Sequence, residues 1–156
     1  MTLFFSTTVA DDEEKKAIRR RSIAVIDENF ETFVKTSIPN LFSNNEKDIL
    51  EGKIELAKNI AKSTNKEGVK AAQLGMAERP DRTEILENLD AKILIIAGKY
   101  DNAVKTENLL KIIPEKTNIK TYVLDCGHNG HWEKPTICAE IINTELFHNL
   151  PKHFLL

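Results

Sequence analysis

Two polar residues follow two apolar segments of the sequence, and together they have the chemistry of an acid–base pair. Asp101 follows the run Ile93–Ala97, and His128 follows the run Tyr122–Leu124. If the runs are neighbouring parallel strands, the two side chains lie at one edge of the sheet, because the carboxyl ends of parallel strands meet there. A carboxylate that accepts a hydrogen bond from histidine Nδ1 fixes the tautomer and stabilises the imidazolium, as in a Ser-His-Asp triad. Asp101 and His128 are therefore candidate catalytic residues.

Each of these two residues also has an ordinary structural explanation. An aspartate just before the helix expected from about residue 103 more often caps that helix. A lone histidine in a loop more often bonds the backbone. Residue identity alone favours these explanations, so the catalytic interpretation depends on the strands that precede Asp101 and His128.

The loop around His128 also contains metal-ligand types, and a serine lies near the first expected strand. His128 and His131 form a His-x-x-His pair beside Asp125 and Cys126, and imidazole and thiolate both suit zinc. Because this loop has no second ligand pair, no metal and no cofactor is expected. Ser6 is a conceivable substitute nucleophile at the same sheet edge, but it lacks a flanking glycine and a strained turn.

The elements that must position the candidate pair follow a β-α-β-α order. The continuous apolar run 92–98 is typical of a strand buried on both faces of a parallel sheet, and 119–124 predicts the next strand. Helices are expected at about 103–113 and 135–146, with right-handed crossovers. Leu3 to Val9 adds a third, N-terminal strand. We expect an α/β fold with a short parallel sheet of two or three strands, which leaves exposed edges.

The segment between the first and second strands predicts four amphipathic helices, at about 11–26, 31–38, 47–62 and 66–77. None can bury its apolar face alone, so the helices must pack on one another or cover something else. The expected organisation is a core strand in 1–10, a helical lid in 11–88 and a C-terminal core in 89–156. Trp132 is expected to pack over the edge of the sheet.

The bulk composition excludes several classes of partner. The 156 residues include 22 basic and 24 acidic side chains, for a net charge of −2, which argues against nucleic acid or an anionic membrane. The two cysteines are too few for a disulfide framework and suggest reduced thiols in the cytoplasm. The first residues, Met-Thr-Leu-Phe-Phe-Ser, have neither the basic start nor the length of a signal peptide or membrane span. A soluble, cytoplasmic protein is expected.

Three short motifs, in this order, resemble the C-terminal part of the α/β-hydrolases. They are Gly98-x-x-Asp101 after one strand, Gly127-His128 after the next, and Glu133-x-Pro135 at the start of the last helix. The run 76–82 is similar to the return from lid to core in the esterase and haloperoxidase-like branch, and 3–16 resembles its sixth strand and first lid helix. The resemblance covers essentially the whole chain and implies a partial α/β-hydrolase fold with a four-helix lid. It also implies His128 as general base, Asp101 as its orienting acid, a small apolar ester substrate and no cofactor.

The sequence departs from the family's pattern in one decisive feature. The family's nucleophile lies in a Gly-x-Ser-x-Gly elbow early in the chain, and one oxyanion-hole amide follows that serine. The 156 residues contain no such motif. We therefore expect a truncated form that is inactive alone; a truncated gene model, a split gene and a degraded copy all remain open. The alternative is a non-catalytic interaction module that pairs with a missing half, or with itself, through a sheet edge near Leu3–Thr8 or Ile93–Ala97.

Overall fold

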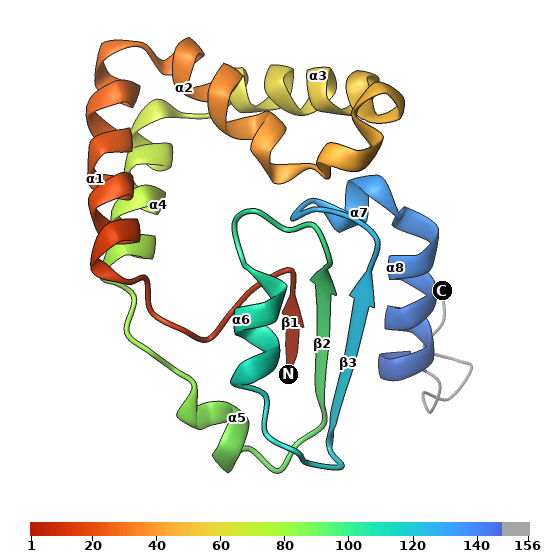
Figure 1. The fold of residues 1–156 in the computed structure, drawn as a ribbon. Coiled ribbons are helices and arrows are strands. Elements are labelled where there is room, and N and C mark those ends of the chain that lie inside the picture. The colour runs from red at the N-terminus through yellow and green to blue at the C-terminus, as the bar shows by residue number, and fades with distance from the viewer. Residues whose placement is uncertain (148–156) are drawn as a thin grey trace.

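A three-stranded parallel sheet forms the centre of the structure (Figure 1). The computed structural model describes residues 1–147, apart from the side chain of Lys47. The strands are β1 (Thr2–Phe4), β2 (Ile93–Gly98) and β3 (Ile119–Leu124), in the order β1-β2-β3. Leu3 is paired with Ile95, and Ile95 with Thr121. The expected α/β fold with a short parallel sheet is confirmed.

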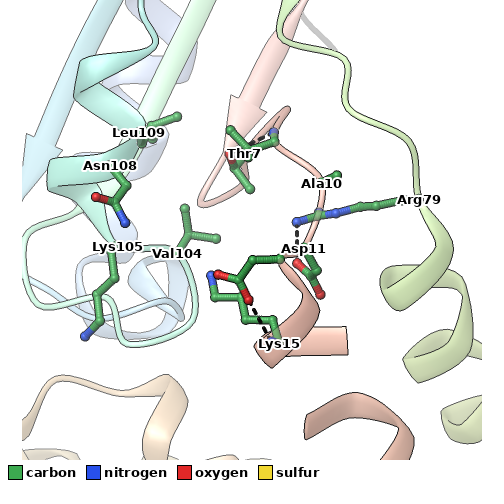
Figure 2. Close-up of a pocket in the computed structure, with 11 residues that line it drawn as sticks. Thr7, Ala10, Asp11, Lys15, Arg79, Val104, Lys105, Asn108 and Leu109 are labelled. Carbon is green, nitrogen blue, oxygen red and sulfur yellow. Dashed lines mark hydrogen bonds and ion pairs between the residues drawn. The ribbon is translucent and has the colours of Figure 1, made fainter. Parts of the chain in front are cut away.

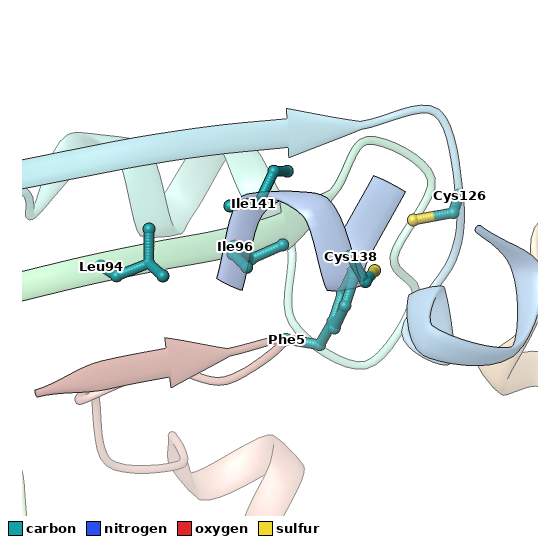
Figure 3. Packing of buried hydrophobic residues seen from close by; sticks show 6 residues of the cluster. All are labelled: Phe5, Leu94, Ile96, Cys126, Cys138 and Ile141. Carbon is teal, nitrogen blue, oxygen red and sulfur yellow. The ribbon is translucent and has the colours of Figure 1, made fainter. Parts of the chain in front are cut away.

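The central strand β2 is buried on both faces, as its continuous apolar sequence predicts. Successive side chains of a strand point to opposite faces, so Leu94 and Ile96 enter one core cluster and Ile93, Ile95 and Ala97 enter another. The first cluster lies under α8 (Pro135–Ile142) and also contains Phe5, Cys126, Cys138 and Ile141 (Figure 3). The second contains Leu86 of α5 (Glu84–Asn88) and Leu109 of α6 (Thr106–Lys111).

Of the five α-helices that lie between β1 and β2 in the chain, the first four overhang the carboxyl ends of the sheet (Figure 1). This helical region consists of α1 (Glu13–Glu28), α2 (Phe30–Ser37), α3 (Lys47–Ser63) and α4 (Lys66–Glu78), with short 3-10 turns at Ile38–Leu41 and Asn44–Glu46. Helices α1 and α4 pack side by side, and α2 leads across to α3. All four expected helices are therefore present.

Side-chain caps explain where three of these helices begin. The side chain of Asp12 accepts a hydrogen bond from Lys15 N at 2.7 Å, and Asn29 accepts one from Thr32 N at 2.9 Å. Asn65 caps α4 in the same way. Such caps satisfy backbone donors that have no partner within the helix. Helix α3 begins differently, after a 3-10 turn and without a side-chain cap.

The N-terminal strand is shorter than expected, because the backbone turns sharply after three residues. The prediction of a strand from Leu3 to Val9 is wrong beyond Phe4. Phe5 has a φ of 47°, in the left-handed region that residues with a Cβ seldom adopt. Its N–H still donates to Ile96 O at 2.8 Å, after which the chain leaves the sheet.

Two helices of the C-terminal part also differ from expectation. The helix expected from about residue 103 begins only at Thr106, because residues 101–104 form a separate hydrogen-bonded turn. The last helix ends at Ile142 and continues as a π-turn, Asn143–Phe147. Residues 148–156 of the expected C-terminal core, with His148 and His153, lie outside the described residues.

The pairing of the strands corrects one expectation about the sheet edges. The run Ile93–Ala97 is not an exposed edge, because β2 is bonded to β1 on one side and to β3 on the other. Within residues 1–147 the outer edges belong to β1 and β3. In the same part of the chain, no helix is both long and apolar enough to cross a bilayer.

Glu145 anchors the C-terminal turn to the sheet through a buried carboxylate. Its Oε1 accepts hydrogen bonds from Tyr122 Oη at 2.6 Å and Lys120 Nζ at 3.0 Å, and its Oε2 pairs with Lys92 Nζ at 2.8 Å. The hydrogen bonds from Lys92, Tyr122 and Lys120 lower the pKa of Glu145 from 4.5 to about 2. The carboxylate therefore ties the turn to the start of β2 and to β3.

This anchor predicts an acid-dependent loss of stability. Because the folded-state pKa is depressed, the stabilisation is present above the ordinary pKa of 4.5 and is lost as the pH falls through about 2. Glu145→Gln should lower the thermal midpoint at neutral pH, and its midpoint should converge with that of the unsubstituted chain toward pH 2. Thermal melts across this pH range test the prediction, with exposed Glu140→Gln as the control. Parallel curves for Glu145→Gln and the unsubstituted chain would contradict it.

Candidate functional site

The side chains of Asp101 and His128 meet at the carboxyl ends of β2 and β3. Asp101 Oδ2 lies 2.9 Å from His128 Nδ1. The aspartate side chain is 2% exposed, whereas that of His128 is 28% exposed. The histidine ring is therefore held by a buried acid on one side and remains accessible on the other. Because Nδ1 faces the carboxylate, Nε2 is the nitrogen left for proton transfer.

The two carboxylate oxygens of Asp101 have separate roles. Oδ1 accepts hydrogen bonds from the backbone N–H groups of Ala103 and Val104, at 2.7 and 2.8 Å. Oδ2 makes the contact with His128. Asp101 therefore acts as a cap through Oδ1 and pairs with His128 through Oδ2. The element that it caps is the turn before α6 and not α6 itself. The two backbone donors also fix the carboxylate plane, and so hold Oδ2 toward the histidine.

The loops that carry the pair are held together by close backbone contact. A Cβ on Gly98 would lie 2.2 Å from Gly127 O, so only glycine allows this approach. Tyr100 N donates to Cys126 O at 3.0 Å, and Thr106 Oγ1 donates to Gly98 O at 2.6 Å. These contacts place the acid loop directly against the histidine loop.

Glu133 joins the histidine loop to the helical region. Its buried carboxylate accepts from Gly127 N at 2.9 Å and from Ser43 N at 3.3 Å. Burial raises the pKa of Glu133, and the two backbone hydrogen bonds oppose that rise only in part. Asn129 N also donates to Leu41 O at 2.9 Å. The loop that carries His128 is therefore bonded to the segment between α2 and α3 through Asn129 and Glu133.

Trp132 packs against the helical region and not over the edge of the sheet. Its ring lies edge-on to Phe42, with centroids 6.3 Å apart, in a cluster with Leu50 and Ile54. The expectation was wrong because the short helix that contains Trp132, α7 (Gly130–Glu133), was not foreseen. It turns the tryptophan toward α3.

The remaining polar groups of this loop do not assemble into a metal-ligand set. His131 lies beside Phe4, with ring centroids 5.9 Å apart, and burial lowers its pKa. Burial also raises the pKa of Cys126 to about 12, which keeps the thiol protonated. Within residues 1–147, no three His, Cys, Asp or Glu side chains gather in a way that would hold a metal ion.

A cavity of about 400 Å³ lies between the helical region and the sheet, with His128 in its wall. Ser6 also lines this cavity, so the structure places it in the same site as His128. Among the hydrogen bonds of residues 1–147, none joins Ser6 to His128. The cavity walls are mostly apolar; the side chains Phe5, Phe33, Ile38, Leu41, Met76 and Val104 contribute to them.

Neither a family model nor a curated protein matches the sequence significantly. Solved structures do. An esterase from Thermogutta terrifontis with malate bound has 30% identity and a TM-score of 0.79, and the match covers 92% of this chain and 53% of that one. The enol-lactonase from Burkholderia xenovorans LB400 gives 15% identity and a TM-score of 0.77, over 93% of this chain and 55% of that one. A bromoperoxidase from Bacillus anthracis has 16% identity and a TM-score of 0.68, and the match covers 90% of this chain and 54% of that one.

The chain has the fold of about half of an α/β-hydrolase. The resemblance of the sequence motifs to the α/β-hydrolases is thus confirmed, and the similar structures include esterases and bromoperoxidases. The chain spans about half the length of these hydrolases. The match is to half of the hydrolase fold, with a partial sheet.

Sequence reasoning missed several polar residues of this hydrolase half. Glu133 was recognised only as part of a motif, and its role as acceptor for the N–H groups of Gly127 and Ser43 was not foreseen. Asp11 pairs with both Arg19 and Arg79, which line the cavity, yet Arg79 is 68 residues from Asp11 in the chain. Nothing in the sequence indicates this pairing, because it joins segments that are far apart in the chain.

Close packing at Gly98 predicts opposite effects for two glycine-to-alanine substitutions. Gly98→Ala forces the two loops apart and should lower the free energy of unfolding by about 1–3 kcal/mol, as overpacking does. Gly75→Ala is the matched control: a Cβ there meets nothing within 4 Å, and α4 should gain up to about 1 kcal/mol of stability. Urea denaturation of both variants tests the pair. A neutral Gly98→Ala would show that the loops tolerate separation.

Glu133 predicts a second, independent effect on stability. Glu133→Ala leaves the N–H groups of Gly127 and Ser43 buried without an acceptor, which should cost roughly 2–5 kcal/mol. Glu133→Gln retains an amide oxygen for Gly127 N and should lose less. Exposed Glu115→Ala should change stability by less than about 0.5 kcal/mol. Equal stability of Glu133→Ala and this control, in urea denaturation, would refute the anchoring role.

Proposed function

We propose that this chain supplies the acid and the base of a Ser-His-Asp ester hydrolase. The observation that carries the proposal is the 2.9 Å contact between Asp101 Oδ2 and His128 Nδ1 in the wall of a cavity. His128 acts as general base and then as general acid, and Asp101 orients it. Residues 1–10 and 89–156 form the core, and residues 11–88 form the lid over the site.

In this mechanism His128 Nε2 takes the proton of a serine hydroxyl while the serine attacks the ester carbonyl carbon. The positive charge that develops on the ring is stabilised by the carboxylate of Asp101, which two backbone N–H groups hold in place. The imidazolium then gives its proton to the departing alcohol. Water repeats the sequence and releases the acid. The reaction requires neither metal nor cofactor.

The nucleophile and the oxyanion hole of this proposal lie outside the 156 residues. No Gly-x-Ser-x-Gly elbow occurs in them, and the similar hydrolases are about twice as long. Strand β1 has its outer edge unpaired within residues 1–147, which is where a further parallel strand would join the sheet. We expect the polypeptide that pairs there to bring the serine, and the chain alone to be inactive.

The cavity supports a small ester or related acyl compound as substrate. Its volume of about 400 Å³ lies within the range of small-molecule sites. Apolar side chains from α2 and α4, Phe33 and Met76 among them, would contact the hydrocarbon part. The two buried free thiols, Cys126 and Cys138, suit the reducing environment of the cytoplasm.

The second candidate is an interaction module without catalysis, and the open edge of β1 favours it. A strand with unpaired N–H and C=O groups can pair with a second copy of the same chain. Self-association would then be a property of the chain itself. A concentration-dependent dimer with no activity in any completed form would support this candidate over the hydrolase.

Completing the sheet should create an esterase. The test fuses this chain to the part of the Thermogutta terrifontis esterase that precedes the matched region. We expect the chain alone to leave p-nitrophenyl butyrate intact and the fusion to hydrolyse it. In the fusion, His128→Ala and Asp101→Asn should each lower kcat by roughly 10³–10⁴-fold, whereas the loop control His131→Ala should keep it.

The fusion must first give a cooperative thermal melt and a monomer in size-exclusion chromatography. A folded fusion without turnover would overturn the proposal, and so would turnover that survives His128→Ala. Hydrolysis by the chain alone that disappears on Ser6→Ala would replace the proposal with a mechanism based on Ser6.

A further inference from the structure

The wall of the cavity that carries His128 also contains two arginines. Arg19 of α1 and Arg79, just after α4, line it together with Gln73. Among the described residues that line this cavity, none is acidic. An apolar cavity with two guanidinium groups is unusual for a site that binds a neutral ester, because charged groups are seldom placed where only hydrocarbon would contact them.

The two arginines share a single carboxylate. Arg79 Nη2 lies 3.1 Å from Asp11 Oδ1, and Arg19 Nε bonds Asp11 Oδ2. Figure 2 shows Arg79 pointing toward Asp11 at the wall of a smaller, neighbouring cavity of about 140 Å³. Burial raises the pKa of Asp11, but the hydrogen bond and charge of Arg19 and the charge of Arg79 outweigh it and lower the pKa. Asp11 is therefore ionised, and the cluster keeps one net positive charge.

The cluster also has more hydrogen-bond donors than acceptors. Each guanidinium carries five N–H donors. Because Asp11 gives one oxygen to each arginine, neither forms a two-pronged pair with it. Arg19 Nη1 has a long contact with Gln73 at 3.4 Å, and Arg79 Nε is buried without a hydrogen-bond partner. The side chains remain 23% and 31% exposed, so a ligand in the cavity can reach them.

We propose that Arg19 and Arg79 form a carboxylate subsite, so that the substrate is an ester that also bears a carboxylate group, such as a monoester of a dicarboxylic acid. A carboxylate offers the planar pair of acceptors that guanidinium groups bind best. It would balance the net charge of the cluster and use its spare donors. The inference rests on the proposed function in one respect, that the cavity beside His128 holds the substrate. It replaces the expected small apolar ester with an anionic one.

A purely structural role is the competing explanation. Asp11 precedes α1 and Arg79 follows α4, so the cluster also holds these two helix ends together. One arginine would be enough for such a clamp. The second arginine leaves charge and donors on the cavity side, which a clamp does not need. Ligand charge separates the two roles, since a clamp is indifferent to it.

The test measures binding to this chain itself, without catalysis. In an NMR titration at low salt, monoethyl glutarate should bind about tenfold more tightly than neutral diethyl glutarate, as expected from charge-assisted hydrogen bonds. About 0.5 M NaCl should weaken the preference only in part, because a half-buried pair is less screened than an exposed one. Arg79→Gln should abolish the preference. The matched control Arg20→Gln removes the same charge from an exposed position on α1 outside the cavity. This control should retain the preference for the monoester.

Equal binding of the two esters by the unsubstituted chain would overturn the inference, as would a preference that survives in folded Arg79→Gln. If Arg79→Gln does not fold, the side-chain Nε–H resonances of Arg19 and Arg79 in the unsubstituted chain decide. They should shift as the monoester saturates, and unmoved resonances would overturn the subsite. Loss of turnover in the fusion with the charge preference intact would instead refute only the triad.

Discussion

The site depends on the contact between two backbone segments, at Gly98 and Gly127. No Cβ fits between them, so the loops after β2 and β3 approach as closely as peptide groups can. This approach brings Asp101 to His128, and it also brings Gly127 N to Glu133 and Gly127 against the backbone of Ser43. A parallel sheet places loop starts side by side, but it does not by itself bring them into contact. The glycines do, because they remove the atoms that would keep the loops apart.

The polar groups around this contact combine structural and chemical roles on single residues. Asp101 closes a turn with one oxygen and faces His128 with the other. Glu133 accepts from two backbone groups that belong to different layers of the molecule. A buried carboxylate is stable only when its lone pairs are satisfied. The same hydrogen bonds that make these acids tolerable inside the fold therefore also fix the geometry around the histidine.

The sequence predicted the parts of the fold that depend on periodicity and local caps. The buried apolar run of β2 and the four helices follow from it, because burial on both faces and amphipathic spacing are local signals. The position of β2 between two other strands does not, since strand pairing is not local. Phe5 defeated the prediction for the first strand, since nothing local shows that a phenylalanine will adopt a positive φ. The start of α6 was misplaced because the side chain of Asp101 competes with the helix for the N–H groups of Ala103 and Val104. The motifs identified Asp101 and His128 as candidates, whereas the pairing of Asp11 with Arg79 depends on tertiary structure alone.

The helical region and the sheet are joined by different forces from those that hold each together. Mainly aliphatic side chains cover both faces of the sheet. The contacts between the sheet and the helical region are largely polar, with Trp132 as an apolar exception. The polar contacts include Glu133 with Ser43, Lys134 with Glu46, and Asn129 with Leu41. The cavity beside His128 lies at this boundary. Charge at this boundary is uneven. Glu133 accepts a hydrogen bond from the histidine loop, whereas Arg19 of α1 and Arg79 at the end of α4 line the cavity. With the substrate we propose, the anionic group would lie near the arginines and the ester near His128, so that binding would also orient the ester.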